Sequence, residues 1–380
     1  MRYIKTIALL AAVLLCLSAC VSSGISDIHT GSDTHGNTIC TSDSGSDGSA
    51  RPMAPIDMVG KTTVAGTPTY KPTWVYQLDN GIMVREVDIY TGNENDPIEI
   101  VQISDLHLSG INEKDIGDAE IMATYNSREW LRDGGGIYYA ERVLEYSKDA
   151  DQIVITGDLM DFFSWGSMEY LKKFVFDKYD NIMACVGNHE TAKKMGGRYS
   201  KQELITRLDT LQSVWCNDVY YSSKIIDGRV MLIQMDNGSQ CDVNGARFWE
   251  CQIQPLTEDL ALARKMGICV LLFYHVPLVT ENFSDMLRYE ILSGGSASLN
   301  FMQNSSLAGG SNADESTLKI YDIITNNGDI IKGAFCGHLH GEYYSEIKAK
   351  TADGKDTVIP QYVLMGNPYD EGHMIKITVY

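Results

Sequence analysis

Five short motifs of polar residues each follow a run of apolar residues in this chain of 380 amino acids. Such apolar runs are typical of buried strands, and side chains placed just beyond strand ends can converge at one edge of an α/β fold. Carboxylate, amide and imidazole groups together suit divalent metal ions. The pattern therefore predicts a metal site and metal-assisted hydrolysis. The motifs are Asp105-Leu106-His107, Gly157-Asp158-Leu159-Met160-Asp161, Gly187-Asn188-His189-Glu190, Tyr274-His275 and Gly337-His338-Leu339-His340.

Each of these residues also has an ordinary explanation when taken singly. An aspartate after a strand often caps a helix or initiates a turn. The distribution of the eight histidines argues for the metal site instead, because two lie near the N-terminus and five of the other six fall inside the motifs. Only His373 is left over. Convergence of so many ligating residue types favours one shared site over separate structural roles.

The order and wording of the motifs resemble the calcineurin-like metallophosphoesterase superfamily, from about Ile98 to the C-terminus. The resemblance implies an α/β fold, a four-layer α/β/β/α sandwich of two mixed sheets with a dinuclear metal site at strand ends. It also implies two divalent ions, drawn from Mn, Fe, Zn, Co and Ni, whose bridging hydroxide attacks a phosphate ester in line. The implied ligands are Asp105, His107 and His340 for the first ion, Asn188, His275 and His338 for the second, and Asp158 as a bridge.

The same resemblance assigns catalytic roles to His189 and Asp161. His189 would face the phosphoryl group, and Asp161 would hydrogen-bond His189 and fix its tautomer. A helix N-terminal residue stabilised by the helix dipole is the alternative for Asp161. Purple acid phosphatases carry tyrosine at the position of Asp161, and phosphoprotein phosphatases carry Arg-Gly where Phe162 and Phe163 stand, so this chain departs from both groups.

These features predict an exported metal-dependent phosphohydrolase, a phosphodiesterase or a phosphomonoesterase, with a small-molecule phosphate ester as substrate. The alternative is a non-catalytic, metal-stabilised surface-binding lipoprotein. His189 and Asp161 argue against it, because a structural metal site needs closed coordination and no acid–base pair. The formal charge of −19 argues against binding to a nucleic-acid duplex, since such binding depends on many Lys and Arg contacts to phosphate.

The N-terminus has the features of an export signal. Arg2 and Lys5 precede an apolar run at 7–17, which is too short to span a bilayer as a helix. The following Leu17-Ser18-Ala19-Cys20 resembles a bacterial lipobox, which predicts a lipid on Cys20 and a place in the bacterial cell envelope. Cleavage after Ala19 is the alternative, although Leu17 is large for such a site. We expect a signal at 1–20, a flexible Ser/Gly/Asp-rich tether at 21–60 and one catalytic domain at 61–380.

Strand and helix patterns alternate through the predicted domain, beginning with a hairpin that turns at Asn80-Gly81. Two long segments, 108–136 and 276–315, carry no predicted element and are interpreted as rims of the substrate cleft, with surface insertion as the alternative. Cys185, Cys269 and Cys336 are expected to be buried thiols, and the pairing of Cys216, Cys241 and Cys251 is left open. Strands are predicted at 98–103, 152–156, 181–186, 219–223, 229–235, 268–273, 330–336 and 374–379, and helices at 137–146, 168–177, 201–214, 256–265 and 318–326.

Overall fold

The structure is a computed structural model of the whole chain. It describes residues 75–78, 80–91, 96–129, 131, 136–191, 199–241, 246–278, 280, 313–366 and 372–380. The predicted signal and tether lie outside the described residues, as does most of the segment 276–315. Among the described helices, none is long and apolar enough to cross a membrane.

The first sheet has six strands in the order β1-β2-β12-β3-β4-β5. Strands β3, β4 and β5 are parallel, so their carboxyl ends meet at one edge, whereas β12 runs antiparallel to β3 and parallel to β2. The strands are β1 (Val75–Gln77), β2 (Met83–Ile89), β3 (Ile98–Ile103), β4 (Gln152–Thr156), β5 (Ile182–Cys185) and β12 (His373–Val379).

The second sheet also has six strands, in the order β10-β11-β9-β8-β7-β6. Strands β7, β8 and β9 are parallel, and the sheet is flanked by antiparallel pairs at both edges. The strands are β6 (Tyr221–Ile226), β7 (Val230–Met235), β8 (Cys269–Phe273), β9 (Ile331–Cys336), β10 (Tyr343–Lys350) and β11 (Asp356–Val363).

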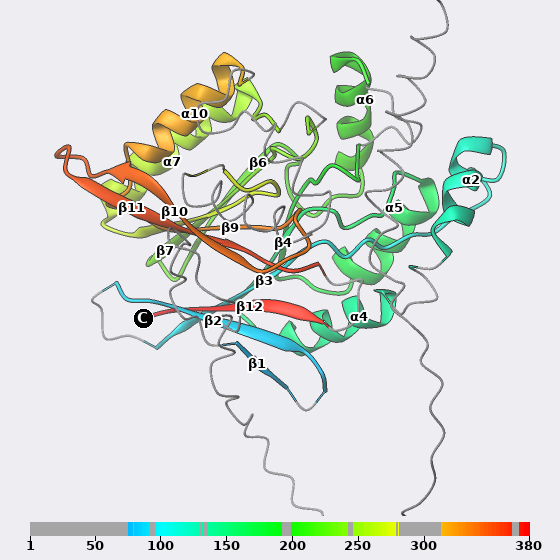
Figure 1. Cartoon of the computed structure of the whole chain (residues 1–380), viewed down its shortest axis with the longest axis horizontal. Helices are drawn as coiled ribbons and strands as arrows, with labels where there is room; N and C mark the ends of the chain where they lie inside the picture. Colours follow the sequence, from blue (N-terminus) through cyan, green and yellow to red (C-terminus); the bar gives the residue numbers. More distant parts are fainter. Residues whose placement is uncertain are drawn as a thin grey trace, which may run out of the picture.

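Helices cover the outer face of each sheet (Figure 1). Helices α7 and α10 lie together over the second sheet, and α4, α5 and α6 pack on the first. A short π-helix, η1 (Lys172–Phe176), continues α5, and a 3-10 turn, η2 (Glu250–Gln252), leads into α7. The helices are α2 (Ala119–Ser127), α4 (Gly136–Ser147), α5 (Trp165–Leu171), α6 (Lys201–Gln212), α7 (Ile253–Met266) and α10 (Glu315–Thr325).

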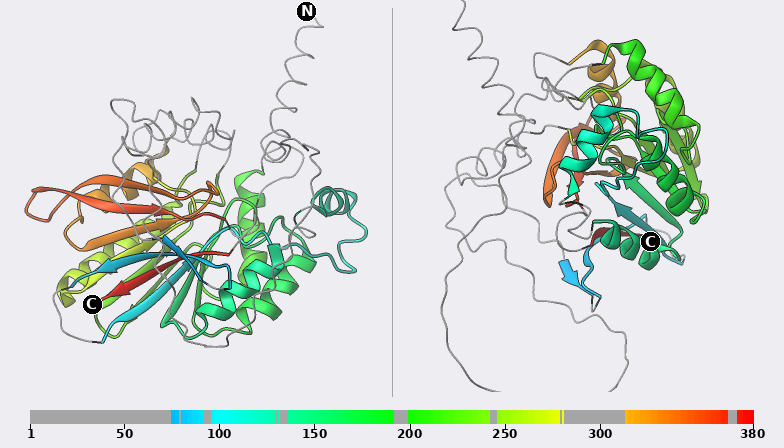
Figure 2. Two further views of the ribbon diagram at one scale, coloured as in Figure 1. Left: turned by 60° about the horizontal axis from the view of Figure 1, so that its bottom comes forward. Right: turned by 90° about the vertical axis from the view of Figure 1, so that its right-hand side faces the viewer.

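Three apolar cores hold these layers together. The middle core lies between the sheets, where Val154 and Met183 of the first sheet meet Leu271 and Phe335 of the second. Figure 2 shows the two sheets face to face, with the red strand β12 and the blue β2 opposite the orange strands. The outer cores join each sheet to its helices. This arrangement confirms the predicted α/β/β/α sandwich of two mixed sheets.

The structure adds elements that the sequence analysis did not predict. Segment 108–136 contains α2, which buries none of its residues and therefore has a weak amphipathic pattern. Strands β10 and β11 form an edge hairpin whose exposed face carries charged residues, and Pro360 inside β11 argues against a strand. Pro360 is tolerated because β11 pairs with β9 only from Gln361 to Val363.

The six described cysteines are free thiols. Cys185, Cys269 and Cys336 are buried, as the apolar runs around them predicted. Cys216 and Cys251 are exposed, and Cys241 is partly buried. None of these three forms a disulfide in the described chain, so the fold does not depend on a cross-link there.

Candidate metal centre

The ligating motifs follow strand ends of both sheets. Asp105 follows β3 and Asp158 follows β4 in the first sheet, while His275 follows β8 and His338 follows β9 in the second. Asn188 lies three residues beyond the last residue of β5. Because parallel strands present their carboxyl ends at the same edge, the site lies where the ends of the two sheets meet.

The motif backbones adopt an unusual conformation. Asp105, His107, Asp158, His338 and His340 all have positive φ angles, between 46° and 73°. In the described chain only one other non-glycine residue, in the β6–β7 turn, shares this feature. Left-handed backbone is costly for residues with a Cβ and persists where surrounding contacts impose it, which is common at functional sites.

Two motif glycines are required by close packing against ligating side chains. Gly157 has a φ of 91°, and a Cβ there would overlap the ring of His275. A Cβ on Gly187 would overlap the carboxylate of Asp158. Each glycine therefore allows a side chain from another motif to approach its backbone, which links the motifs sterically.

The first group of side chains joins Asp105, His107, Asp158 and His340, whose ligating atoms lie within 4.8 Å of one another. His340 Nε2 lies 3.2 Å from Asp105 Oδ1 and 3.1 Å from His107 Nε2. His107 Nε2 lies 3.9 Å from the nearest oxygens of Asp105 and of Asp158. Two imidazole nitrogens and two carboxylates thus surround one small volume.

The second group joins Asp158, His275 and His338 within the same 4.8 Å limit. His275 Nε2 lies 3.2 Å from Asp158 Oδ2 and 3.0 Å from Asn188 Oδ1. His338 Nδ1 lies 2.9 Å from that Asn188 oxygen. The other ring nitrogen of His275, Nδ1, lies 2.7 Å from the carbonyl of Thr156, which can only accept, so Nδ1 carries the proton and Nε2 turns to the site.

The donor set and its spacing fit two divalent ions. Nitrogen and oxygen ligands about 2.1 Å from one ion lie roughly 3.0–3.5 Å from each other, which matches the closest separations in both groups. Asp158 belongs to both groups, as a bridging carboxylate must. The buried Asp/His cluster is therefore able to hold a dinuclear centre, and its mixed N and O donors leave the metal open.

The sequence model of the calcineurin-like phosphoesterase family matches residues 98–342, a range that contains all five motifs. The chain belongs to this family. It is accordingly a metal-dependent phosphoric ester hydrolase. No curated protein sequence matches the chain.

Several solved structures are similar to this chain. A dimetal phosphatase from Danio rerio is 14% identical over 71% of this chain and 88% of its own, with a TM-score of 0.34. PhoD is 10% identical over 79% and 63%, with a TM-score of 0.41. The 5′-nucleotidase of Candida albicans is 15% identical over 71% and 45%, with a TM-score of 0.30. The chain spans less than two thirds of the length of the last two.

Electrostatics keep the carboxylates of this phosphoesterase in the form that binds metals. Burial opposes ionisation of Asp105, but the hydrogen bond and charge of His340 lower its pKa to about 2. Burial likewise opposes ionisation of Asp158, yet His275 and His189 hold its pKa well below the ordinary value. In return, Asp158 raises the pKa of His275 to about 10 against the effect of burial. Both carboxylates are ionised at neutral pH.

Glu190 has a role that the sequence analysis of the phosphoesterase missed. Its buried carboxylate accepts backbone N–H groups from Gly187 at 2.7 Å, Met160 at 2.8 Å and Asp158 at 3.1 Å. It thereby joins the loop after β4 to the loop after β5. Burial and the neighbouring Asp158 raise its pKa to about 7, against the hydrogen bonds from Met160 and Gly187 and the charge of His275. The signal available in sequence was its place directly after Asn188 and His189.

Asp161 and His189 meet differently from the expected arrangement. His189 Nδ1 lies 2.7 Å from the backbone carbonyl of Asp161 and 3.7 Å from its carboxylate, so the carbonyl fixes the tautomer. The carboxylate instead lies 3.3 Å from Nδ1 of His107 and binds Arg128, which was not identified from sequence. Arg128 donates to both carboxylate oxygens of Asp161, and a two-point bond of this kind to a charged partner is about twice as strong as a neutral hydrogen bond, which explains the difference.

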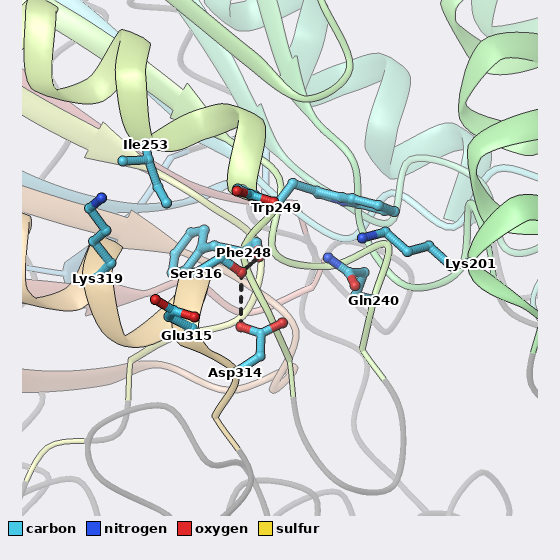
Figure 3. A pocket seen from close by; sticks show the side chains of 10 residues that line it. Lys201, Gln240, Phe248, Trp249, Ile253, Asp314, Glu315, Ser316 and Lys319 are labelled. Atoms are coloured by element: carbon cyan, nitrogen blue, oxygen red, sulfur yellow. Dashed lines mark hydrogen bonds between the residues drawn. The ribbon is translucent and has the colours of Figure 1, made fainter.

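A pocket of about 310 Å³ opens between α7, α10 and the start of α6 in the phosphoesterase (Figure 3). Phe248, Trp249 and Ile253 give it apolar walls, and Lys201 and Lys319 carry positive charges beside acidic residues at the start of α10. Trp249 donates a hydrogen bond from its indole nitrogen to Asp236, which follows β7. The pocket therefore lies beyond the same end of the second sheet as His275.

Proposed function

We propose that this chain is an exported phosphohydrolase that uses two divalent ions to cleave a phosphomonoester or phosphodiester of a small molecule. The observation that carries the proposal is the position of Asp158, whose carboxylate belongs to both groups of ligating side chains. A closed structural site has no need of a shared carboxylate beside an accessible imidazole. Family membership supplies the class of reaction.

In this proposal Asp105, His107 and His340 would hold the first ion and Asn188, His275 and His338 the second, and Asp158 would be shared by both. When bound, the ions would supply a water activated for attack and would offset charge on the phosphoryl oxygens. The protein contributes rigidity, because five of the seven ligands have left-handed backbone imposed by their surroundings and Glu190 fixes two of the loops.

His189 is the residue suited to proton transfer. Its side chain is 27% exposed, whereas those of His107 and His275 are 2% exposed or less, so a substrate can reach it. The Asp161 carbonyl holds the proton on Nδ1 and leaves Nε2 directed toward Asp158, 3.9 Å away. A protonated Nε2 in that position can donate to the leaving oxygen of the ester.

The substrate in this proposal is a small-molecule ester. The charge of −19 disfavours a long polyanion, because electrostatic attraction to a duplex needs many cationic contacts. A compact phosphate ester meets mainly the ions and His189. Which ester of this class is the physiological substrate depends on the part of the molecule that is remote from phosphorus.

The proposal is tested with the full chain in detergent, purified and loaded with each of Mn²⁺, Zn²⁺, Co²⁺, Ni²⁺ and Fe²⁺. We expect hydrolysis of bis-p-nitrophenyl phosphate, p-nitrophenyl phosphate or both, dependent on added metal. A His189→Gln preparation made in parallel controls for contaminating phosphatases. Binding of two ions without hydrolysis of either ester under any metal would favour the surface-binding alternative.

We also propose that the chain is lipid-anchored through Cys20 in the bacterial cell envelope. The proposal is supported by the lipobox pattern at Cys20 and by the two basic residues that precede the apolar run at 7–17. Cys20→Ala should move the protein from the detergent phase to the aqueous phase in a Triton X-114 partition. Cys16→Ala, inside the apolar run, is the matched control and should stay with the detergent. Retention of the Cys20 variant in the detergent phase would contradict the anchor.

A further inference from the structure

Arg128 reaches the centre from the end of α2. Its Nε donates to Asp161 Oδ2 at 2.7 Å and a terminal nitrogen donates to Oδ1, so the guanidinium binds both carboxylate oxygens. The side chain of Arg128 is 17% exposed and the Asp161 carboxylate is fully buried. Two parallel N–H···O bonds to a charged, water-excluded carboxylate fix its plane as well as its place.

Through Asp161, this contact affects the orientation of two histidines of the centre. The fixed carboxylate lies 3.3 Å from His107 Nδ1, which leaves His107 Nε2 directed at the first group of ligands. His189 is held through the Asp161 carbonyl, and its ring packs edge-on against that of His107 with centroids 4.5 Å apart. The orientation of both rings therefore depends on where the Asp161 residue is held.

The chain leading to α2 is itself fastened to α5. Asp115 accepts the backbone N–H groups of Trp165 and Gly166, at 2.9 and 2.8 Å. Ser164 donates to the carbonyl of Gly110 at 2.7 Å. Segment 110–118 is thus held in place by these hydrogen bonds. Helix α2 follows this segment and ends directly before Arg128, so the position of Arg128 is fixed as well.

We propose that Arg128 is a positioning residue for the phosphoesterase reaction, acting through Asp161 to orient the metal ligand His107 and, with it, His189. The proposal rests on the function proposed above and extends it to a residue outside the five motifs. Lysine cannot replace it fully, because an ammonium group has no planar fork for two carboxylate oxygens. Loss of a group that orients a metal ligand typically lowers metal affinity or activity by about 10- to 100-fold.

The test is a calorimetric titration of the metal-stripped full chain with Mn²⁺ alone, comparing wild type with Arg128→Lys and Arg128→Gln. The ion whose shell includes His107 should bind about 10- to 100-fold more weakly in Arg128→Gln, and the other ion should bind as in wild type. Arg128→Lys should fall between the two. At saturating Mn²⁺, kcat for bis-p-nitrophenyl phosphate should fall while KM changes little. The reason is that the substitution misorients His189 but removes no contact that binds the substrate.

Arg264 provides the matched control, since it makes the same kind of two-point contact with Asp329 at the end of α7, away from the centre. Arg264→Gln should leave both Mn²⁺ affinities and kcat unchanged. A double variant, Arg128→Gln with Asp161→Asn, adds a second readout: its loss should be no larger than that of the worse single variant, because both act through one contact.

Wild-type affinity for both ions in Arg128→Gln would overturn the proposal. Equal weakening of both ions, matched by a fall in Tm, would also overturn it in favour of a general structural role; should Arg128→Gln fail to fold, the same criteria apply to Arg128→Lys. The titration needs no hydrolysis, so a wild type that binds two Mn²⁺ ions but cleaves no ester would refute the proposed function while the role of Arg128 was still decided.

Discussion

Asp158 Oδ2 lies 3.2 Å from Nε2 of His275, although the two residues follow strands of different sheets. This contact is one of those that join the two halves of the sandwich in the centre, together with that of His340 and Asp105. Both side chains are buried, so the position of each depends on the packing of its own sheet. A dinuclear centre at such a junction is sensitive to any shift of one sheet against the other.

Replacing Asp158 should remove more function than replacing any other ligand, because only this carboxylate belongs to both groups. In Asp158→Ala, elemental analysis should find fewer than two bound ions, and hydrolysis should fall to background. His340→Ala, which removes a ligand of one group only, is the comparison. Wild-type turnover in a contaminant-free Asp158→Ala protein would refute the two-ion arrangement.

His189→Gln should keep both ions and lose rate. Its Nε2 lies 3.9 Å from the Asp158 carboxylate, and its assigned role is proton transfer. Loss of a general acid lowers kcat by roughly 10²–10⁴-fold. Elemental analysis and initial rates on the same preparation decide the matter: a variant that has lost metal would show that His189 is a ligand instead.

Glu190→Ala should destabilise the fold markedly. It leaves three buried backbone N–H groups without their acceptor, and an unsatisfied buried group costs about 1–3 kcal/mol. A loss of about 3 kcal/mol or more in the free energy of unfolding is expected by urea denaturation. Glu190→Gln keeps one acceptor oxygen and should lose less. Equal stability of Glu190→Ala and wild type would mean that the loops are held by other contacts.

Asp236 should make the free energy of unfolding depend on pH, in a direction that follows from its raised pKa. Burial raises its pKa to about 6, although Ser239 and Trp249 donate hydrogen bonds to it. The folded state therefore binds this proton more tightly than the unfolded state does, so the resulting stability is full below about pH 4 and is lost as pH rises through 6. The side chain of Asn does not titrate. The free energy of unfolding of Asp236→Asn should therefore rise by up to about 3 kcal/mol relative to that of wild type between low and neutral pH.

Urea unfolding of both proteins at pH 4, 5, 6 and 7.5 measures that gain, and differences between them cancel the titration of the other groups. A difference that stays constant across this range would show that Asp236 is ionised throughout.

Local sequence determined much of the skeleton. β3 and β4 occupy the predicted residues, and the Asn80-Gly81 turn joins β1 to β2 as expected. These elements are buried on one or both faces, so their apolar pattern is strong. α2 and the β10–β11 hairpin were missed because they bury little or carry charges on alternate residues, and their pairing is decided by the sheet edge they join.

The sequence by itself determined which residue types stand at the strand ends, and so the chemistry: carboxylates, an amide and imidazoles in the order of one family. Tertiary structure alone decided which atoms of those residues meet. In the fold, the carbonyl of Asp161 accepts a hydrogen bond from His189, and its carboxylate accepts hydrogen bonds from Arg128, 33 positions away in the chain. No local pattern encodes that choice, because it follows from the competition of distant groups for one buried carboxylate.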